Sequence, residues 1–183
     1  PRDWSSDVCS SDLDFIMKIA VIGYSGSGKS TLAKQLAAHY GIPLLYLDTV
    51  NFKENWQLRD REECRKIVAD FMQNENWVID GNYSAFYLLE RLSQADIIII
   101  LRYNRFVCIR QAFRRNREYK GRSRESITQG CNEKIDLEFF LWLIFKQYSK
   151  ARKEKFREIQ AKYPDKTYVF RSRKELNAYL NEL

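Results

Sequence analysis

The feature that most constrains this chain is the stretch GYSGSGKS, residues 23–30. Its spacing is G-x-x-x-x-G-K-[ST], and it lies between an apolar run, KIAVI, and an amphipathic run, TLAKQLAAHY. Glycines let the backbone curl so that successive N–H groups point at phosphate oxygens, and the helix N-terminus that follows adds partial positive charge. We therefore expect a phosphate-binding loop, and the alternative is a Gly/Ser turn with a chance lysine. The expected loop residues are Gly23, Ser25, Gly26, Ser27, Gly28, Lys29, Ser30 and Thr31.

The rest of the chain alternates short apolar runs with longer amphipathic ones. The apolar runs predict five strands, at residues 18–22, 44–47, 77–79, 96–101 and 167–170. Their continuous apolarity is typical of a parallel sheet that is covered on both faces. Helices are predicted at residues 29–40, 61–73, 85–92, 105–119 and 133–163, and from residue 173 onward. The pattern predicts an α/β fold of three layers, with a doubly wound five-stranded parallel sheet.

Length and composition indicate one soluble domain. The chain has 183 residues, of which 45% are hydrophobic and 30% charged. No apolar run approaches the roughly 20 residues that a membrane-spanning helix needs. Four cysteines without metal-ligand spacing favour a reducing cytoplasm and predict no structural metal site.

Residues 1–16 differ from the remainder. They are rich in Ser and Asp and show little periodicity, whereas Met17 precedes a strand pattern directly. We expect them to be a non-native tail and residues 17–183 to form the domain, and the alternative is a native polar tail. The tail carries Arg2 against four aspartates, a net charge of −3, so the formal +7 of the whole chain becomes +10 for residues 17–183.

A carboxylate follows the third predicted strand, in VIDGNY at residues 78–83. Asp80 lies at the edge of the sheet where parallel strands end, and ligands bind there. In a nucleotide-binding sheet this position faces the Mg²⁺ that the Ser30 hydroxyl also contacts. We predict Ser30 and Asp80 as metal ligands, and Lys29 as the catalytic group that contacts the β- and γ-phosphates. The alternative for Asp80 is an ordinary Asp-Gly turn.

A second carboxylate, Asp48, ends the LLYLD run at the same sheet edge. We expect it to bind the acceptor or to act as its general base. A helix N-cap role for Asp48 or Thr49 is an equal alternative. Trp56 is a candidate wall of the acceptor pocket, although loop aromatics are more often simply packed.

The segment from Arg102 to Arg124 is strongly basic. On a helix, Arg110, Arg114 and Arg117 share one face, and Gly121 opens a polar loop. We expect a lid near residues 114–132 in which Arg114 and Arg117 act as catalytic arginines that close over transferring phosphates. The alternatives are a solvated basic face and a nucleic-acid patch.

Several motifs together resemble the bacterial topology modulation (FlaR-like) proteins, an adenylate-kinase-like branch of the P-loop NTPases. They are GYSGSGKST, LDTVNF, WVIDGNY, the NR of YNRF and GCNEKIDLEFFLW. The resemblance covers Met17 to the C-terminus and implies ATP with Mg²⁺, a helical arginine-bearing lid, and an adenine pocket near Arg171 and Arg173. The family name implies an influence on DNA supercoiling. Asn82 and Tyr83 stand where nucleoside monophosphate kinases have Pro-Arg, which argues against a nucleotide acceptor.

The motifs lead to two functional hypotheses. The first is an ATP- and Mg²⁺-dependent phosphotransferase for an unknown small-molecule acceptor, in which catalysis is mainly positioning and charge neutralisation. The second is a nucleic-acid-associated ATP-binding protein that influences DNA topology, and a regulatory NTPase with a protein partner is a third class. Steep salt dependence would indicate the DNA binder.

Overall fold

The structure is a computed structural model that describes residues 17–132 and 137–182. The expected non-native tail, residues 1–16, lies outside the described residues. So do Glu133, Lys134 and Asp136, which belong to the GCNEKIDLEFFLW motif.

Five parallel strands form one sheet in the order β2-β3-β1-β4-β5. Each corresponds to a predicted strand, and the predicted α/β fold is confirmed. The strands are β1 (Lys18–Gly23), β2 (Leu44–Tyr46), β3 (Trp77–Asp80), β4 (Ile97–Leu101) and β5 (Thr167–Phe170). Because β1 lies between β3 and β4, the chain reverses its direction of sheet growth beside β1, and the loop after β1 lies at this switch point.

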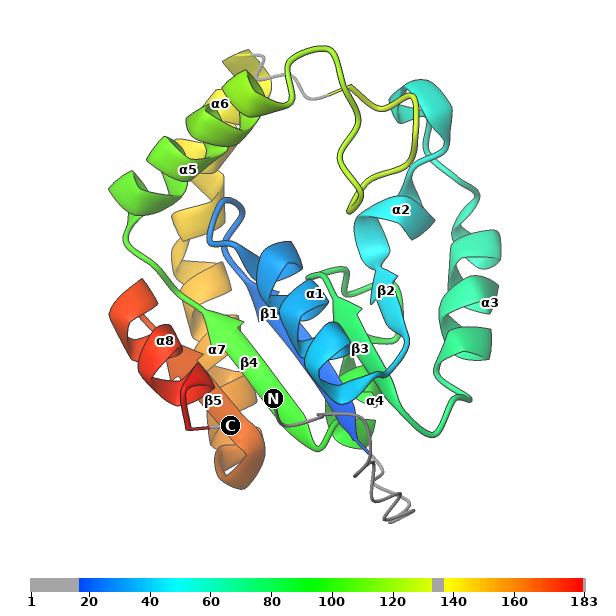
Figure 1. The fold of residues 1–183 in the computed structure, drawn as a ribbon, viewed down its shortest axis with the longest axis vertical. Helices are drawn as coiled ribbons and strands as arrows, with labels where there is room; N and C mark the ends of the chain where they lie inside the picture. The colour runs from blue at the N-terminus through cyan, green and yellow to red at the C-terminus, as the bar shows by residue number, and fades with distance from the viewer. Residues whose placement is uncertain (1–16, 133–136, 183) are drawn as a thin grey trace, which may run out of the picture.

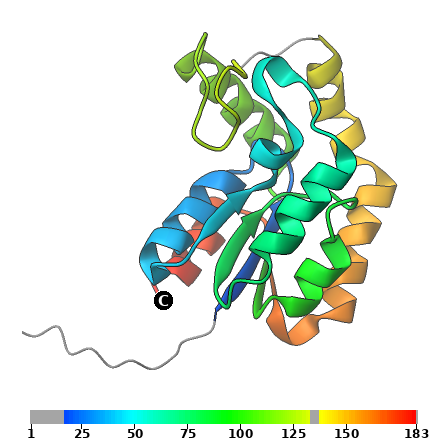
Figure 2. The same cartoon turned by 90° about the vertical axis from the view of Figure 1, so that its right-hand side faces the viewer.

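Helices cover both faces of the sheet (Figures 1 and 2). α1 (Lys29–Tyr40) and α8 (Arg173–Leu180) lie on one face, and α4 (Leu88–Gln94) and α7 (Lys150–Lys162) on the other. α2 (Leu47–Asn51) and α3 (Arg61–Phe71) lie on the β2 side, whereas α5 (Arg105–Glu118) and α6 (Leu137–Ile144) project beyond the carboxyl ends of the strands. Three single 3₁₀ turns complete the description: η1 (Glu54–Trp56), η2 (Lys146–Tyr148) and η3 (Pro164–Lys166).

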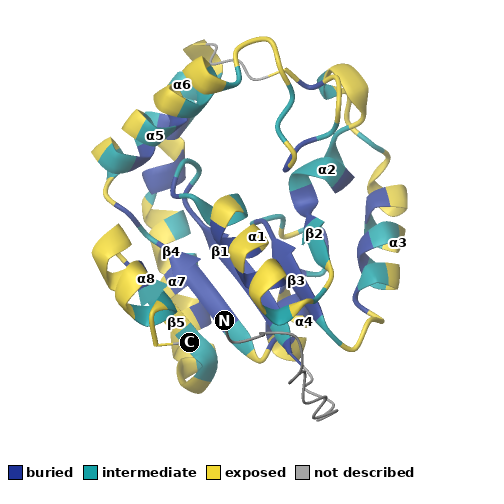
Figure 3. Cartoon of the chain, in the orientation of Figure 1, coloured by how far each residue is buried: buried dark blue, intermediate teal, exposed yellow. Residues whose placement is uncertain are grey.

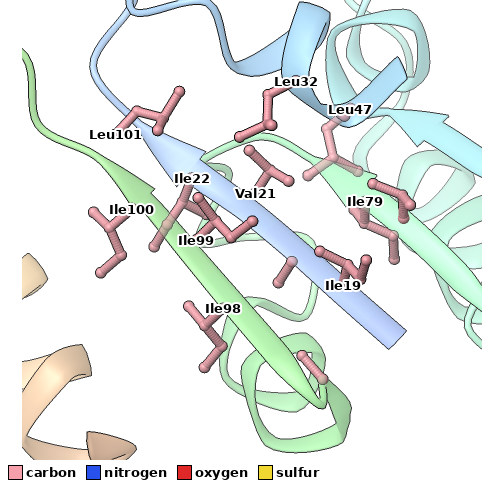
Figure 4. Close-up of a cluster of buried hydrophobic side chains, with 14 of the residues drawn as sticks. Ile19, Val21, Ile22, Leu32, Leu47, Ile79, Ile98, Ile99, Ile100 and Leu101 are labelled. Carbon is pink, nitrogen blue, oxygen red and sulfur yellow. The ribbon is translucent and has the colours of Figure 1, made fainter. Parts of the chain in front are cut away.

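The core consists of aliphatic side chains from the central strands and the helices against them (Figure 4). Ile19, Val21 and Ile98 are fully buried in β1 and β4, and Leu32 of α1 packs on the same cluster. Continuous apolar runs form these strands because helices remove both faces from water. Burial is correspondingly deepest in the sheet, while the outer surfaces of α5 and α6 are largely exposed (Figure 3). No helix among the described residues is long and apolar enough to cross a membrane.

The single helix predicted at residues 133–163 is wrong. Its described part forms α6, η2 and α7, because Ser149 takes an extended conformation and caps α7, accepting from the Arg152 N–H at 3.4 Å. The FFLWLIF run, expected to be a buried helix face, buries only Leu143 fully, whereas Leu141 and Phe145 are exposed. The helical spacing of apolar residues therefore does not reveal the interruption at Ser149, which depends on side-chain capping at that residue.

The segment predicted as a lid, residues 114–132, is helical only at its start, and its role as a lid stays a prediction. Helix α5 ends at Glu118, and residues 119–132 form a loop that returns toward α2 (Figure 1). Thr128 Oγ1 donates to the Thr49 carbonyl at 3.2 Å, and Cys131 Sγ donates to the Lys53 carbonyl at 3.1 Å. The loop thus lies over the α2 side of the sheet edge.

Candidate functional site

The loop after β1 requires glycine at two positions. At Gly23, where φ is 143°, a Cβ would lie 2.3 Å from the Leu101 carbonyl oxygen. At Gly26, where φ is 75°, a Cβ would lie 2.4 Å from the Cys108 carbonyl oxygen of α5. Both conformations are strained for other residues, and both contacts are with backbone, which cannot move aside cheaply. The sequence motif therefore reflects close packing of the loop between β4 and α5.

Side chains from distant segments hold this loop. The Asn82 amide accepts from the Gly23 N–H at 3.0 Å and donates to the Gly23 carbonyl at 2.7 Å. The buried Gln147 accepts from the Ser25 N–H at 2.8 Å and donates to the Leu143 carbonyl at 2.9 Å. The Tyr24 ring packs against Tyr148 with centroids 4.2 Å apart. Asn82 and Gln147 were not predicted as site residues, because neither has a local signal beyond its place in WVIDGNY or after an apolar run.

Lys29, Ser30 and Asp80 meet at the end of the loop. The Ser30 hydroxyl donates to Asp80 Oδ2 at 2.6 Å, and Lys29 Nζ donates to the Tyr24 carbonyl at 2.9 Å. Burial raises the pKa of Asp80, and the nearby Lys29 charge opposes that rise only in part. Burial lowers the pKa of Lys29, which Asp80 and then Asp48 oppose. The predicted grouping of Lys29, Ser30 and Asp80 is thus present in the structure.

The remaining loop residues occupy different surroundings. Ser27 is buried, and its hydroxyl donates to the Tyr24 carbonyl at 2.7 Å, so it supports the loop from inside. Gly28 is the left-handed N-cap of α1, and Thr31 lies exposed in the first turn of that helix. The first turn of α1 contains no acidic side chain that would oppose an anion.

A divalent cation fits the Ser30–Asp80 pair. Asp80 is only 7% exposed, and its Oδ1 has no hydrogen-bond partner among the described residues. A buried carboxylate oxygen without a partner is costly unless a ligand satisfies it. The described residues contain no cluster of three His, Cys, Asp or Glu side chains. Mg²⁺ does not need one, since it uses one or two carboxylates together with water and substrate phosphates.

Asp48 lies at the same end of the sheet, beyond β2, in the first turn of α2 rather than at a strand end. Tyr83 Oη donates to Asp48 Oδ1 at 2.8 Å, and Arg124 Nη2 lies 3.7 Å from Asp48 Oδ2. Burial and the Asp48 charge raise the pKa of Tyr83, so its hydroxyl stays protonated and donates. The alternative N-cap role of Asp48 is wrong, because Tyr46 occupies the N-cap of α2.

Trp56 lies close to this group, on η1. Its ring makes an edge contact with Phe52 at a centroid distance of 5.2 Å, and its Nε1 donates to the Asn132 carbonyl at 3.1 Å. Trp56 therefore joins the loop of residues 119–132 to the α2 side. Its role as a pocket wall stays a prediction.

Arg91 supports the turn that carries Asn82 and Tyr83. Its guanidinium is fully buried and donates to the carbonyls of Phe86 at 2.9 Å, Gly81 at 3.2 Å and Tyr83 at 2.9 Å. Burial lowers the pKa of Arg91 to about 10. A buried charge with three acceptors fixes the path of the chain after Asp80.

Two other arginines lie nearer to the site than the predicted Arg114 and Arg117, whose catalytic role stays a prediction. Arg115 lies close enough to Lys29 for its charge to lower the Lys29 pKa, and Arg124 pairs with Asp48. Arg114 and Arg117 are exposed and line a groove of about 780 Å³ on the outer side of α5. Arg114 and Arg115 are consecutive on a helix and therefore point in different directions. Which of the two lies near Lys29 depends on the rotation of α5 about its axis.

Arg173 also lines this groove. It donates from Nη2 to Gln111 Oε1 at 3.0 Å, and Gln111 is the side chain nearest to Gly28, so the groove reaches the phosphate-binding loop. Arg171 is exposed, and its backbone N–H donates to Glu175 at 2.8 Å. Of the two residues predicted for an adenine pocket, the structure brings only Arg173 to the groove.

Comparisons with known proteins agree with this geometry. The model of the AAA family, ATPases associated with various cellular activities, matches residues 19–81, from β1 through Gly81. A shikimate kinase from Dehalococcoides mccartyi is 36% identical over 73 residues, which is 34% of this chain. This chain spans 42% of the length of that enzyme in the match.

A solved structure extends the likeness to most of the chain. The shikimate kinase from Bacteroides thetaiotaomicron superposes with a TM-score of 0.50 at 21% identity, over 91% of this chain and 99% of that one. This likeness shows a shared fold, a five-stranded parallel sheet with helices on both faces.

Proposed function

We propose that this protein is an ATP- and Mg²⁺-dependent kinase that transfers a phosphoryl group to a small-molecule acceptor. The observation that carries the proposal is the 2.6 Å bond from Ser30 to the buried Asp80, beside Lys29 and the glycine-rich loop. The segment of 73 residues that is 36% identical to a shikimate kinase supports the same class.

The nucleotide side of the site is the loop of residues 23–31. Backbone N–H groups of the loop and Lys29 bind the phosphates, and Ser30 and Asp80 hold the cation. Bound Mg²⁺ neutralises charge on the transferred group. The groove lined by Arg110, Arg114 and Arg173 receives the base, since it continues from Gly28 through Gln111.

The acceptor side is formed by Asp48, Tyr83 and Arg124. Asp48 accepts the proton of the acceptor hydroxyl, and Tyr83 holds the carboxylate in place through its 2.8 Å bond. Arg115 and Arg124 supply positive charge where the phosphoryl group is transferred. Electrostatic stabilisation of the transition state is usually the largest contribution to catalysis. The three cysteines among the described residues are free and buried, which supports a cytoplasmic location.

A screen of ATP consumption across sugars, hydroxy acids and nucleosides tests the proposal. We expect acceptor-dependent consumption that Asp48→Asn abolishes while nucleotide binding remains. Acceptor-independent hydrolysis that Asp48→Asn leaves unchanged would show an NTPase instead.

A second candidate is a nucleic-acid-associated ATP-binding protein, the function that the topology modulation resemblance implies. It is favoured by the three exposed arginines on α5, Arg110, Arg114 and Arg117, which form no ion pair among the described residues. This candidate predicts that duplex DNA binding weakens steeply with salt. It also predicts that Arg114→Ala reduces the slope of log binding constant against log salt concentration by about one unit.

A further inference from the structure

A second cluster of cations lies behind the phosphate-binding loop, on the face of the sheet that α7 covers. Arg152 and Lys155 of α7 line a small cavity of about 50 Å³ together with Asn82 and Ser84 of the turn after β3. Its remaining wall is apolar and consists of Ile22, Leu88, Phe156 and Ile159. This volume is several times what one water molecule needs.

The polar groups that line this cavity are mainly hydrogen-bond donors. Lys155 Nζ lies 2.5 Å from Ser84 Oγ, and the Arg152 guanidinium lies over the Trp142 ring at 5.6 Å. Among the described residues, no carboxylate forms an ion pair with Arg152 or Lys155. The side-chain oxygen of Asn82, Oδ1, already accepts a hydrogen bond from the Gly23 N–H, so it does not offset the positive charge of Arg152 and Lys155.

These cations repel one another. Burial lowers the pKa of Lys155, and the charges of Arg152 and Arg91 lower it further, opposed only by Glu158 of the same helix. Burial also lowers the pKa of Arg152. Like charges that share a half-buried cavity destabilise the fold unless an anion relieves them, because water screens them poorly there.

We propose that this cavity is a binding site for a tetrahedral oxyanion, either free phosphate or the phosphoryl group of a small ester. Arg152, Lys155 and the Ser84 hydroxyl bind the anion, as charge-assisted donors do in phosphate sites. The cavity shares no lining residue with the loop of residues 23–31 or with the groove proposed for the base of ATP. Asn82 lines the cavity and also clamps Gly23, so the two sites share this residue.

NMR titration of the full chain with inorganic phosphate at constant ionic strength tests this inference. We expect saturating shifts at the amides of Ser84 and Lys155, with an affinity separate from that of the Gly26 and Gly28 amides. Lys155→Gln should weaken the first set by at least about tenfold, a loss typical of one charged hydrogen bond, and leave the second set unchanged. Lys153→Gln, on the exposed side of the same helix, is the matched control and should bind like the parent.

The result that overturns the inference is a titration in which only the loop amides shift, or one in which Lys155→Gln binds phosphate at Ser84 as the parent does. Arg152→Lys keeps the charge of the other cation and should retain phosphate binding more fully than Lys155→Gln does. Glycerol 3-phosphate in a parallel titration distinguishes the sources. Tighter binding than inorganic phosphate assigns the site to esters, and weaker binding assigns it to free phosphate.

Discussion

Asp80 shows how the candidate site trades stability for binding at the scale of one residue. Its Oδ2 accepts from Ser30, whereas its Oδ1 is buried without a partner among the described residues. The fold therefore holds a carboxylate that burial makes harder to ionise. Such an arrangement is typical of a site built for a cation, because structural carboxylates are usually satisfied by the protein itself.

Asp80→Asn tests this directly. The raised pKa of Asp80 in the fold means that the protonated form is favoured there, so the ionised carboxylate lowers stability as pH rises through that pKa. Without nucleotide or metal, Asp80→Asn should therefore raise the melting temperature at pH 7, and the gain should shrink as the pH falls below that pKa. Turnover with Mg²⁺ should fall by at least about 100-fold.

Thermal unfolding from pH 3 to pH 8 and a Mg²⁺ titration of turnover measure the two effects. In Asp80→Asn, the Ser30 hydroxyl can still donate to the side-chain oxygen, so the substitution removes the negative charge and keeps this hydrogen bond. A variant with the stability of the parent at every pH and the same Mg²⁺ dependence would make Asp80 an ordinary turn residue. Asp70→Asn, at an exposed position of α3, is the control.

At the scale of elements, the position of α5 decides which arginines lie near the glycine-rich loop. Gly26 packs against the Cys108 carbonyl, so α5 approaches the loop closely at this point. Arg115 then faces Lys29, whereas Arg114 and Arg117 face the groove with Arg173. The two sets should have separate kinetic effects.

Arg115→Ala should lower kcat by at least about 100-fold with little change in ATP affinity, because its charge acts mainly on the transferred group. Arg114→Ala and Arg117→Ala test the lid prediction made from the sequence, which expects the same loss of kcat. The groove geometry instead predicts a higher KM for ATP with kcat within a few-fold of the parent for Arg114→Ala. Steady-state kinetics on the three variants separates the two expectations, and an unchanged kcat in Arg115→Ala would contradict the structural one.

Gln147 links the segment after α6 to the phosphate-binding loop. Its side chain is fully buried and uses both ends of its amide, so Gln147→Ala leaves the Ser25 N–H and the Leu143 carbonyl without this partner. We expect a loss of about 1–3 kcal/mol in the free energy of unfolding. Urea denaturation measures it.

The exposed Gln73→Ala is the matched control and should change stability by less than about 0.5 kcal/mol. An equally small change for Gln147→Ala would mean that another group replaces its bonds to the loop.

At the scale of the whole molecule, ligand binding and folding are linked, because the loop, α5 and the segment after α6 contact one another only in the native state. ATP with Mg²⁺ at 100 times its dissociation constant should stabilise the fold by about 2.7 kcal/mol. Lys29→Ala should abolish this stabilisation, and because Lys29 also lies beside the buried Asp80, the unliganded melting temperature of the variant is measured in parallel. Differential scanning calorimetry with and without nucleotide measures both quantities, and an undiminished shift in Lys29→Ala would contradict the loop assignment.

The sequence by itself determined the local parts of this protein. Five apolar runs became five parallel strands, and the GYSGSGKS spacing became a loop whose glycines are required by contacts at Gly23 and Gly26. The grouping of Lys29, Ser30 and Asp80 was also predictable, because parallel strands end at one edge of the sheet. These features depend on residue type and on spacing along one strand or turn.

Only the tertiary structure decided the contacts between distant segments. The Asn82 clamp on Gly23 joins residues 59 positions apart, and the Gln147 bond to Ser25 joins residues 122 positions apart. The rotation of α5, the break at Ser149 and the cation cavity behind the loop depend likewise on packing. Local periodicity states which face of a helix is apolar, but the angle at which that face meets the sheet, and hence which charged side chains meet, is set by side chains from elsewhere in the chain.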